Sequence, residues 1–566
     1  MLTRDDIKLL KARYKLALNY RDQEWRNEWM DIRKYLAPKT GRFWDRAERR
    51  PAEGGSDRKA IINSAGIKAR KIAVAGLKGG LTPRSLPWLK LGLFDPDLEK
   101  WEPVREWLAL TTRILLSTLG STNFYSAIMN VYSEEMTFGT GAWKVIEHPE
   151  KIVHFKHWTI GSYLLVQDDF GEITTTFREW PMRIADAAKQ YGKERLSVAR
   201  RGMLDKNPDA YMYVVKAIFP RDDIKRAGII GPKGMKWASV VWEVGAEGEQ
   251  VLGESGFETK PFMAPRWDTV EEDPYGNECP GMEILPDVKM LQKMELEKLL
   301  SVEKINAPPM NVPAGFKGRL SLDARAKNEM PSNAGNSKIE PTIQLQPGVR
   351  DIREEIRDVE QRIKDGYFND LFLMFIGEDK QMTATEVIRR HEEKLSLLGP
   401  VIERQSDELL TPTLARVYQV MARDGRLPAP PRELREKELR IEYISLLAQA
   451  QKAVGTNAVE RGLDIVGRIA DIQARTTNAY PEILDKVDFD STLDDYADKI
   501  GWSPENIRST DDANRRRQGR AQAQQGQAQM AQAAEMADVA TKMGQVDVDP
   551  NKRTALTEAL RRLPAR

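Results

Sequence analysis

Two long amphipathic helical patterns, separated by a segment without helical periodicity, constrain the fold of this chain more than any other feature. Residues 284–306 place apolar side chains at helical intervals along the whole segment. Residues 349–372 repeat the pattern, with apolar positions that step by four, three and four: Ile352, Ile356, Val359 and Ile363. About forty residues rich in Gly, Pro and Asn lie between them. The sequence therefore predicts a helical hairpin with arms roughly 35 Å long and a small domain at its tip.

The second arm also has a charged face. Its members recur at helical spacing outside the apolar positions: Arg353, Arg357, Glu360 and Lys364. Charged side chains are rarely buried without partners. This face must therefore meet water, a neighbouring subunit or a channel, and the sequence leaves these three alternatives open.

The region before the hairpin has the pattern of an α+β domain of about 280 residues. Four helices are expected first, followed by a series of short strands rich in β-branched and aromatic residues. The expected helices are 4–36, 60–77, 101–119 and 124–138, with a shorter one at 182–191. The expected strands are 142–148, 151–158, 162–167, 173–177, 210–219 and 238–244. The fold class is therefore α+β and mostly helical.

Two helix starts carry a capping box, in which a Thr or Ser side chain and an acid three residues later satisfy each other's backbone N–H groups. Thr3 and Asp6 form the first, and Thr383 and Glu386 form the second. The second box begins the stretch TATEVIRRHEEK, whose acids, bases and histidine resemble an active site. Each of these side chains has a helix-start or helix-surface role instead, so a helix start is the preferred interpretation.

The segments after the hairpin are expected to be helical. The helix from Thr383 should run to about residue 423 with a kink at Gly399-Pro400. The segment from about 433 to 473 should also be helical, with a turn near residues 455–457. From residue 515 the chain is rich in Gln and Ala, a composition typical of either disorder or a helix that needs an assembly to be stable.

Composition and missing motifs argue against several functions. Lys and Arg total 87 and Asp and Glu total 85, so the net charge of +2 does not suggest non-specific DNA binding by bulk charge. The single cysteine, Cys279, rules out an intramolecular disulfide and suits a reducing compartment. No phosphate-binding loop, nucleophile elbow, signal peptide, metal-ligand spacing or transmembrane segment is recognised. We therefore expect no cofactor, no metal, no membrane association and no enzymatic activity.

The order of these features resembles a known family. An N-terminal amphipathic helix, GGLTPRSLPWLKL (residues 79–91), MTFGTGAWKVIE (136–147), the helix–insertion–helix and TATEVIRRHEEK (383–394) are similar to the head-to-tail connector, or portal, proteins of T7-like short-tailed bacteriophages. The two most telling motifs are MTFGTGAW and MTATEV. The Gln/Ala-rich tail departs from the pattern.

The resemblance implies an organisation into the wing, stem, clip and crown of a portal fold. Each part corresponds to a range of this chain: wing 1–281, stem helices 284–306 and 349–374, clip 307–348, tunnel loop 375–382, a wing or channel helix 383–426, crown 427–510, and a tail 511–566 that is either a barrel helix or disordered. It also implies site residues. In the tunnel loop, near DNA, these are Glu378, Asp379, Lys380 and Gln381. On the clip, facing the adaptor or terminase, they are Lys317, Arg319, Arg325 and Lys327. On the channel face of the stem they are Arg353, Arg357, Glu360 and Lys364.

The resemblance further implies a ring of twelve copies at one capsid vertex, assembled in the host cytoplasm, through which viral double-stranded DNA passes during packaging and ejection. The implied partners are the major capsid protein, scaffold, terminase large subunit, tail adaptor and internal core proteins. Two alternatives remain: another virion assembly protein such as an adaptor or scaffold, and a metal-dependent nuclease. The strand-rich stretch argues against a mostly helical scaffold.

Overall fold

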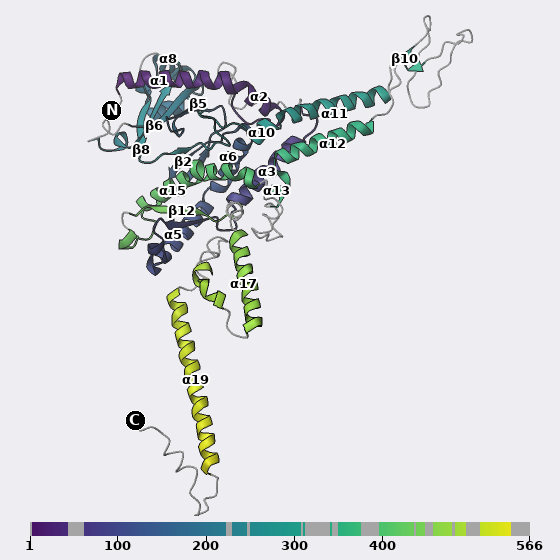
Figure 1. Ribbon diagram of the computed structural model, residues 1–566. Coiled ribbons are helices and arrows are strands. Elements are labelled where there is room, and N and C mark those ends of the chain that lie inside the picture. The colour runs from purple at the N-terminus through teal and green to yellow at the C-terminus, as the bar shows by residue number, and fades with distance from the viewer. Residues whose placement is uncertain are drawn as a thin grey trace, which may run out of the picture. The chain divides into compact units, whose positions relative to one another are not determined.

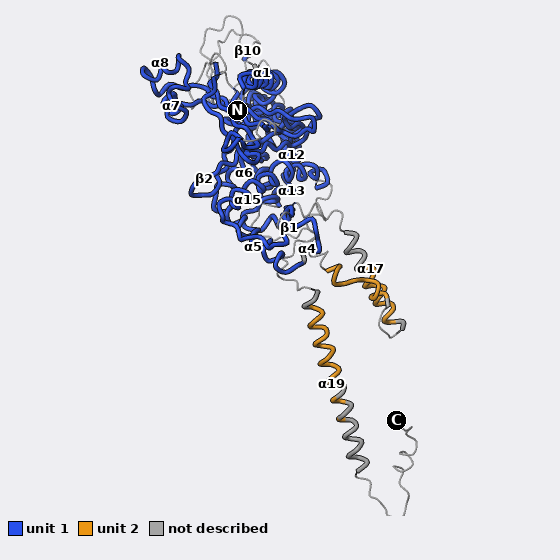
Figure 2. Tube along the Cα trace, turned by 90° about the vertical axis from the view of Figure 1, so that its left-hand side faces the viewer, with its two compact units in different colours: residues 1–455 blue, residues 456–566 orange. Residues whose placement is uncertain are grey.

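The computed structural model describes most of the chain and divides it into two compact units (Figures 1 and 2). The units are Met1–Gly455 and Thr456–Arg566. The described residues are 3–43, 61–221, 229–245, 250–306, 310–311, 340–341, 349–374, 395–434, 437–445, 447, 457–477, 482–493 and 510–544.

A five-stranded antiparallel meander forms the sheet nearest the N-terminus. Its strands follow chain order: β4 (Tyr163–Gln167), β5 (Ile173–Arg183), β6 (Tyr211–Pro220), β7 (Trp237–Glu243) and β8 (Gly253–Phe257). Neighbouring residues point to opposite faces, so Val214 packs in one apolar cluster and Val215 in another. Helix α1 (Arg4–Tyr20) covers the Val215 face through Leu10 and Tyr14. Helix α7 (Ile184–Tyr191) covers the Val214 face.

A second, three-stranded sheet lies at the centre of the unit. Its order is β3 (Ile152–His157), β2 (Trp143–His148) and β9 (Phe262–Met263). Trp143 pairs with His157 on one side and with Met263 on the other. Strands β2 to β7 confirm all six strands expected from the sequence. The short strands β8 and β9 and helix α8 (Val198–Lys206) were not predicted.

Helices pack around this centre in the order expected. The N-terminal capping box is confirmed, because Thr3 Oγ1 accepts from Asp6 N and Asp6 Oδ2 accepts from Thr3 N. The long first helix is interrupted by a π-helical turn, so it consists of α1, Arg21–Trp25 and α2 (Arg26–Tyr35). The other helices of this layer are α3 (Ala65–Leu81), α4 (Pro96–Lys100), α5 (Glu102–Ser121) and α6 (Phe124–Phe138).

Helix α3 ends four residues later than predicted, because its glycines serve close packing and do not break the helix. A Cβ at Gly76 would clash with the backbone of Phe372, which lies in α13 (Asn369–Leu373). The prediction of one unbroken helix over 349–372 was also wrong. Helix α12 (Val349–Gly366) ends first, Phe368 takes a left-handed conformation with φ of 51°, and α13 follows.

The helix predicted over 433–473 was wrong in its first part. Residues Leu439–Tyr443 form β12, which pairs antiparallel with β1 (Leu89–Leu93), so that Leu89 lies opposite Tyr443. The sequence LRIEY alternates apolar and charged residues, and Leu439 and Ile441 pack against an apolar cluster that includes Leu91. This period of two is the strand signal that the helical prediction overlooked.

The segment after the second capping box is described only from residue 395, so the box at Thr383 lies outside the described residues. Residues 395–404 are helical, Gln405–Leu410 form a π-helical turn, and α15 (Thr411–Arg423) completes the helix near its predicted end.

The second unit, described by itself, is helical. It contains α17 (Asn457–Thr477), a short 3-10 turn at Glu482–Lys486 and α19 (Thr510–Gly544). Of the two states considered for the Gln/Ala-rich segment, the helix is the one observed. Arg517 Nη2 donates to Asp490 Oδ1 over 2.7 Å, which ties α19 to the helical residues 489–493 that follow the turn.

Candidate functional site: the helix hairpin and the joint at its base

The predicted hairpin is present. Helices α11 (Leu285–Asn306) and α12 lie side by side, and the chain returns between them through the short antiparallel pair β10 (Met310–Asn311) and β11 (Glu340–Pro341) (Figure 1). Arg362, near the end of α12, forms an ion pair of 3.3 Å with Asp287, near the start of α11. The two helices therefore run antiparallel with their base in the first unit.

The inner part of the hairpin is packed and the outer part is exposed. On α12 the predicted apolar face is buried, with Val359 3% exposed and Ile363 fully buried. On α11 Leu291 is fully buried, whereas Leu296, Leu299 and Leu300 are 45–53% exposed. These three leucines lie on one helix face by their spacing, and we call them the outer leucine ridge. A ridge of large exposed apolar side chains is typical of a surface that another protein covers.

The base of the hairpin is held by a hydrogen-bond network around Asn63. Asn63 Nδ2 donates to Glu295 on α11 over 3.1 Å and to Glu360 on α12 over 2.8 Å. Gln292, which is buried, accepts from Asn63 N and donates to Asn63 O. Lys289 adds an ion pair of 2.6 Å to Asp31 on α2. One loop thus fixes the spacing of both helices.

The structure places the four stem residues predicted for the channel on a single face of α12. Arg353, Arg357 and Lys364 are exposed. Glu360 is half-buried because it accepts the hydrogen bond from Asn63. The tunnel-loop candidates Glu378, Asp379, Lys380 and Gln381 and the clip candidates Lys317, Arg319, Arg325 and Lys327 lie outside the described residues.

The motif MTFGTGAW forms a tight joint below the hairpin. Gly139 ends α6 with φ of 80°, in the left-handed region where glycine is favoured, and a Cβ there would clash with the carbonyl of Gly276. Thr140 Oγ1 accepts from Gly276 N over 2.7 Å, and Trp267 N donates to Gly139 O over 2.8 Å. The motif is therefore a backbone-to-backbone contact, which explains its two glycines without any catalytic role.

The π-helical turn at Gln405–Leu410 completes this joint. Glu408 accepts from Arg266 through its side chain, over 2.6 Å from Nη2, and also from the Arg266 backbone N–H over 2.9 Å. Arg266 is only 5% exposed, so the pair is well shielded. Arg404, just before the turn, forms an ion pair of 3.0 Å with Asp268. π-Helical turns often occur at functional sites; here Glu408 in the turn and Arg404 just before it both contact residues 266–268.

Glu135 lies fully buried in the same joint. Burial, followed by the nearby charge of Glu408, raises its pKa well above the usual value of 4.5. Gln405 Nε2 donates to Glu135 Oε1, whereas the buried atoms Glu135 Oε2 and Gln405 Oε1 have no hydrogen-bond partner. Burial therefore favours the neutral, protonated form of the Glu135 side chain in the folded chain.

These base residues were not singled out from the sequence. Asn63, Gln292, Arg266 and Glu408 are separated by more than a hundred residues of chain where they meet, so no local pattern connects them. The only available signal in the sequence was the position of Gln292, a polar residue four places after Val288 on an otherwise apolar helix face.

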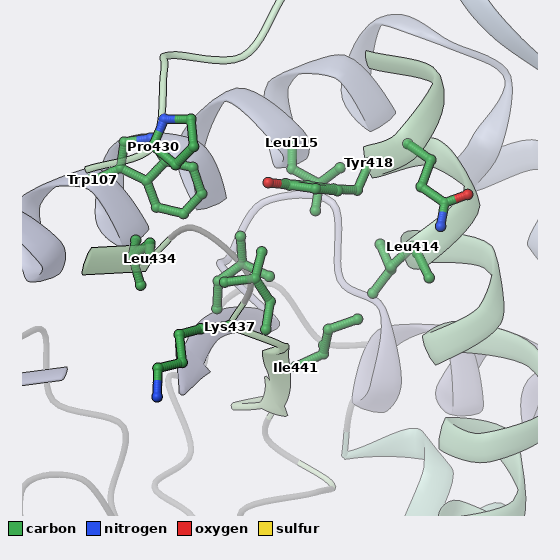
Figure 3. Close-up of a pocket in the computed structure, with 12 residues that line it drawn as sticks. Trp107, Leu115, Leu414, Tyr418, Pro430, Leu434, Lys437 and Ile441 are labelled. Atoms are coloured by element: carbon green, nitrogen blue, oxygen red, sulfur yellow. The ribbon is translucent and has the colours of Figure 1, made fainter. Parts of the chain in front are cut away.

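A cavity of about 300 Å³ lies away from the hairpin, between α5, α15 and the β1–β12 pair (Figure 3). Trp107, Leu414 and Ile441 are among its mostly apolar lining, and Tyr418 and Lys437 add polar groups. Within the described ranges no cluster of His, Cys, Asp and Glu side chains could hold a metal ion. The lining of the cavity is therefore mostly apolar.

Comparison with known proteins identifies the family. The family described as bacteriophage head to tail connecting protein matches residues 8–507. The chain belongs to this family. The match covers the hairpin, its base and the MTFGTGAW joint, and it ends before α19. It confirms the resemblance to head-to-tail connectors drawn from the order of the motifs.

Two relatives match this connector over nearly its whole length. A protein of Bordetella phage BPP-1 named "Probable portal protein" is 34% identical over 564 residues, which cover 99% of each chain. The "Portal protein" of Salmonella phage epsilon15 is 32% identical over 541 residues, covering 94% of this chain and 95% of that one.

A solved structure titled "Virion of native gene transfer agent (GTA) particle" aligns with 72% of this chain and 92% of its own. Its sequence identity is 10% and its TM-score is 0.30, too low to support any argument. Among the helices that the structure describes, none is both long and apolar enough to cross a membrane.

Proposed function

We propose that this connector is a portal subunit: copies of the chain form a ring at one vertex of a phage capsid, and double-stranded DNA passes through the ring during packaging and ejection. The observation that carries the proposal is the near full-length identity with two proteins named portal proteins. The match covers 99% of the first relative and 95% of the second.

The outer leucine ridge supports the ring. Leu296, Leu299 and Leu300 lie on the exposed half of α11, where the same chain does not cover them within the described residues. Copies related by rotation bring one surface of each subunit against a different surface of the next, and such contacts close into a ring when the rotation permits. We propose that the ridge packs on the neighbouring copy, in a ring of twelve as the family resemblance implies.

We assign the parts of the portal fold by taking the hairpin as the stem. Helices α11 and α12 are the stem, residues 307–348 between them are the clip, and the unit before the hairpin is the wing. Residues 375–382 are the tunnel loop beside the DNA, with Lys380 as the candidate phosphate contact. We place the start of the crown at about residue 457, later than the sequence suggested, because β12 pairs with β1 inside the first unit.

The charged face of α12 lines the channel in this proposal. Arg353, Arg357 and Lys364 are exposed there beside the half-buried Glu360. A mixture of both charges suits a conduit, because a uniformly basic wall would bind phosphates tightly and hold the DNA in place. The clip faces the terminase and then the tail adaptor, while the wing and crown contact the capsid protein, scaffold and internal core proteins.

The first test is the mass of the purified assembly, measured by size-exclusion chromatography with light scattering and inspected by negative-stain microscopy. A ring of about a dozen copies with a central hole is the expected result. A stable monomer or dimer at all salt and protein concentrations would contradict the proposal.

A pair of matched variants locates the interface. Leu300→Glu places a charge on the outer leucine ridge and should leave the subunit folded but unable to form rings. Leu110→Glu is the control, because Leu110 on α5 is equally exposed, at 45%, and lies outside the ridge. Circular dichroism checks the fold of both. Rings formed equally well by the two variants would rule out the ridge as the contact.

A further inference from the structure

Four cationic side chains gather where the three-stranded and the five-stranded sheets meet, and we call them the cation cluster: Lys144, Lys156, Arg178 and Lys216. Lys144 on β2 lies directly opposite Lys156 on β3. Arg178 on β5 lies directly opposite Lys216 on β6. Like charges directly opposite each other destabilise a sheet, so two such pairs close together call for a physical explanation.

One aromatic ring connects the cluster to a fifth cation. The ring centroid of Phe257, at the end of β8, lies 4.4 Å from Lys144 Nζ and 5.9 Å from Lys216 Nζ. The guanidinium of Arg416 on α15 lies 5.5 Å from the same centroid. Cation–π contacts with one ring partly offset the repulsion, but they do not neutralise three positive charges.

Within the described residues, none of the four side chains is paired with a carboxylate. Arg416 has Glu147 at 3.7 Å, but the charged neighbours of Lys144, Lys156 and Lys216 are all cations. Arg178 rests against the rings of Trp158 and Trp180, and its Nε is buried without a hydrogen-bond partner.

Burial makes this arrangement costly. Lys144 is only 8% exposed. Burial, followed by the neighbouring charge of Lys216, lowers the pKa of Lys144 to about 6, and burial also lowers the pKa of Lys216 and Lys156. Buried cations in proteins are normally paired. The cluster therefore has the charge and the donors for a partner that this part of the chain does not supply.

Another strand lysine of the same chain shows the usual solution. Lys90 on β1, which is 27% exposed, has Glu99 at 3.3 Å and Glu442 at 4.0 Å. A half-buried strand lysine in this protein thus receives carboxylates from nearby elements. The cation cluster differs from Lys90 in having none among the described residues.

We propose that the cation cluster is a binding site for an oxyanion, either inorganic phosphate or a carboxylate from a neighbouring copy of the chain. Lys156 is exposed and Lys216 and Arg178 are half-buried, so they form the approach, while Lys144 lies at the buried end. Because Lys144 is only slightly exposed, only a small anion or a single acidic side chain can reach it. The lysine amino groups and the unpaired Nε of Arg178 are the donors that such an anion requires, and a bound anion favours the charged form of the lysines.

The test adds inorganic phosphate to the full-length protein and measures the Tm of thermal unfolding at each concentration. Sodium chloride at matched ionic strength is the control. A ligand that binds the folded chain raises Tm in a concentration-dependent manner. Phosphate should raise the Tm of the unassembled wild-type chain more than chloride does. If the wild type is already assembled, the measurement uses the Leu300→Glu variant.

Three variants assign that response to the cluster. Lys144→Met and Lys216→Met each remove one amino-group donor while keeping most of the side-chain volume, and both should reduce the phosphate response to that of chloride. The second variant keeps the test valid if the first fails to fold. Lys90→Met is the matched control, because it removes a strand lysine that has carboxylate partners, and it should keep the full response.

The assembled particle distinguishes the two sources of the anion. If phosphate is the ligand, rings and unassembled chains respond alike. If the neighbour provides a carboxylate, only unassembled chains respond, and Lys144→Met weakens assembly measured by light scattering. The neighbour alternative rests on the proposed ring, whereas the response of unassembled chains does not. A missing response in unassembled chains, or one that Lys144→Met and Lys216→Met retain, would overturn the proposal whether or not rings form.

Discussion

The two halves of helix α11 differ in what covers them, although both are rich in apolar residues. In the inner half Val288 and Leu291 are at most 1% exposed, and Gln292 is held by hydrogen bonds to residues 62–63. In the outer half Leu296, Leu299 and Leu300 are about half-exposed. The inner half is part of the subunit core, and the outer half is a surface without a partner in the described chain.

This contrast teaches that apolar periodicity predicts a helix face but does not say whether the chain itself or another molecule buries it. Substitutions at residues that stabilise the subunit should lower its stability, whereas substitutions at residues that we assign to assembly or to the channel should leave it nearly unchanged.

The largest effect is expected from the core half. Leu291→Ala should lower the free energy of unfolding of the unassembled chain by about 2–5 kcal/mol, because it leaves a cavity at a fully buried position. Leu296→Ala, on the outer leucine ridge, should change it by less than about 0.5 kcal/mol. Denaturant unfolding followed by circular dichroism measures both. Equal losses would show that the two halves are buried alike.

The second largest loss of stability is expected from the hydrogen-bond network at the base of the hairpin. Asn63→Ala removes the amide that donates to Glu295 and Glu360, and should cost about 1–3 kcal/mol in the same measurement. Asn63→Asp keeps the oxygen that accepts from Ala65 N but replaces the donor with an acceptor. If Asn63→Asp were as stable as the wild type, the network would act only through that helix-start hydrogen bond.

The buried acid of the joint should make stability depend on pH. The pKa of Glu135 is raised, so between about pH 4.5 and its folded value the folded chain holds a proton that the unfolded chain has lost. This contribution to stability is complete below about pH 4.5 and is lost as the pH rises through the folded pKa. Glu135→Gln should remove that decline of Tm with pH in calorimetric scans. Parallel pH profiles for wild type and variant would mean that Glu135 is ionised when folded.

The smallest effect on the subunit is expected on the charged face of α12. Arg357→Ala should change the free energy of unfolding by less than about 0.5 kcal/mol, because the side chain is exposed. Ring formation should also persist if Arg357 lines the channel, as light scattering will show. Loss of rings would move this face from the channel to the subunit interface.

Local patterns were sufficient for most of the architecture. The period of 3.6 located α5, α6, α11 and α12, and the period of two located β2 to β7, because these signals depend on which face of an element is buried and not on its partner. The capping box at Thr3 was predicted from four residues alone. The order of the motifs also led to the connector family, which the comparison confirmed.

Long-range contacts decided the rest. Strand β12 was mistaken for helix because its partner β1 lies about 350 residues earlier, and five residues of alternation carry little weight without that partner. The base network, the Arg266–Glu408 pair and the cation cluster bring together side chains from distant elements, so no spacing in the sequence reveals them. Sequence determined which faces are apolar and where helices begin. Only the tertiary structure decided which of those faces the subunit buries itself, because burial is a property of the packed chain and not of any one segment.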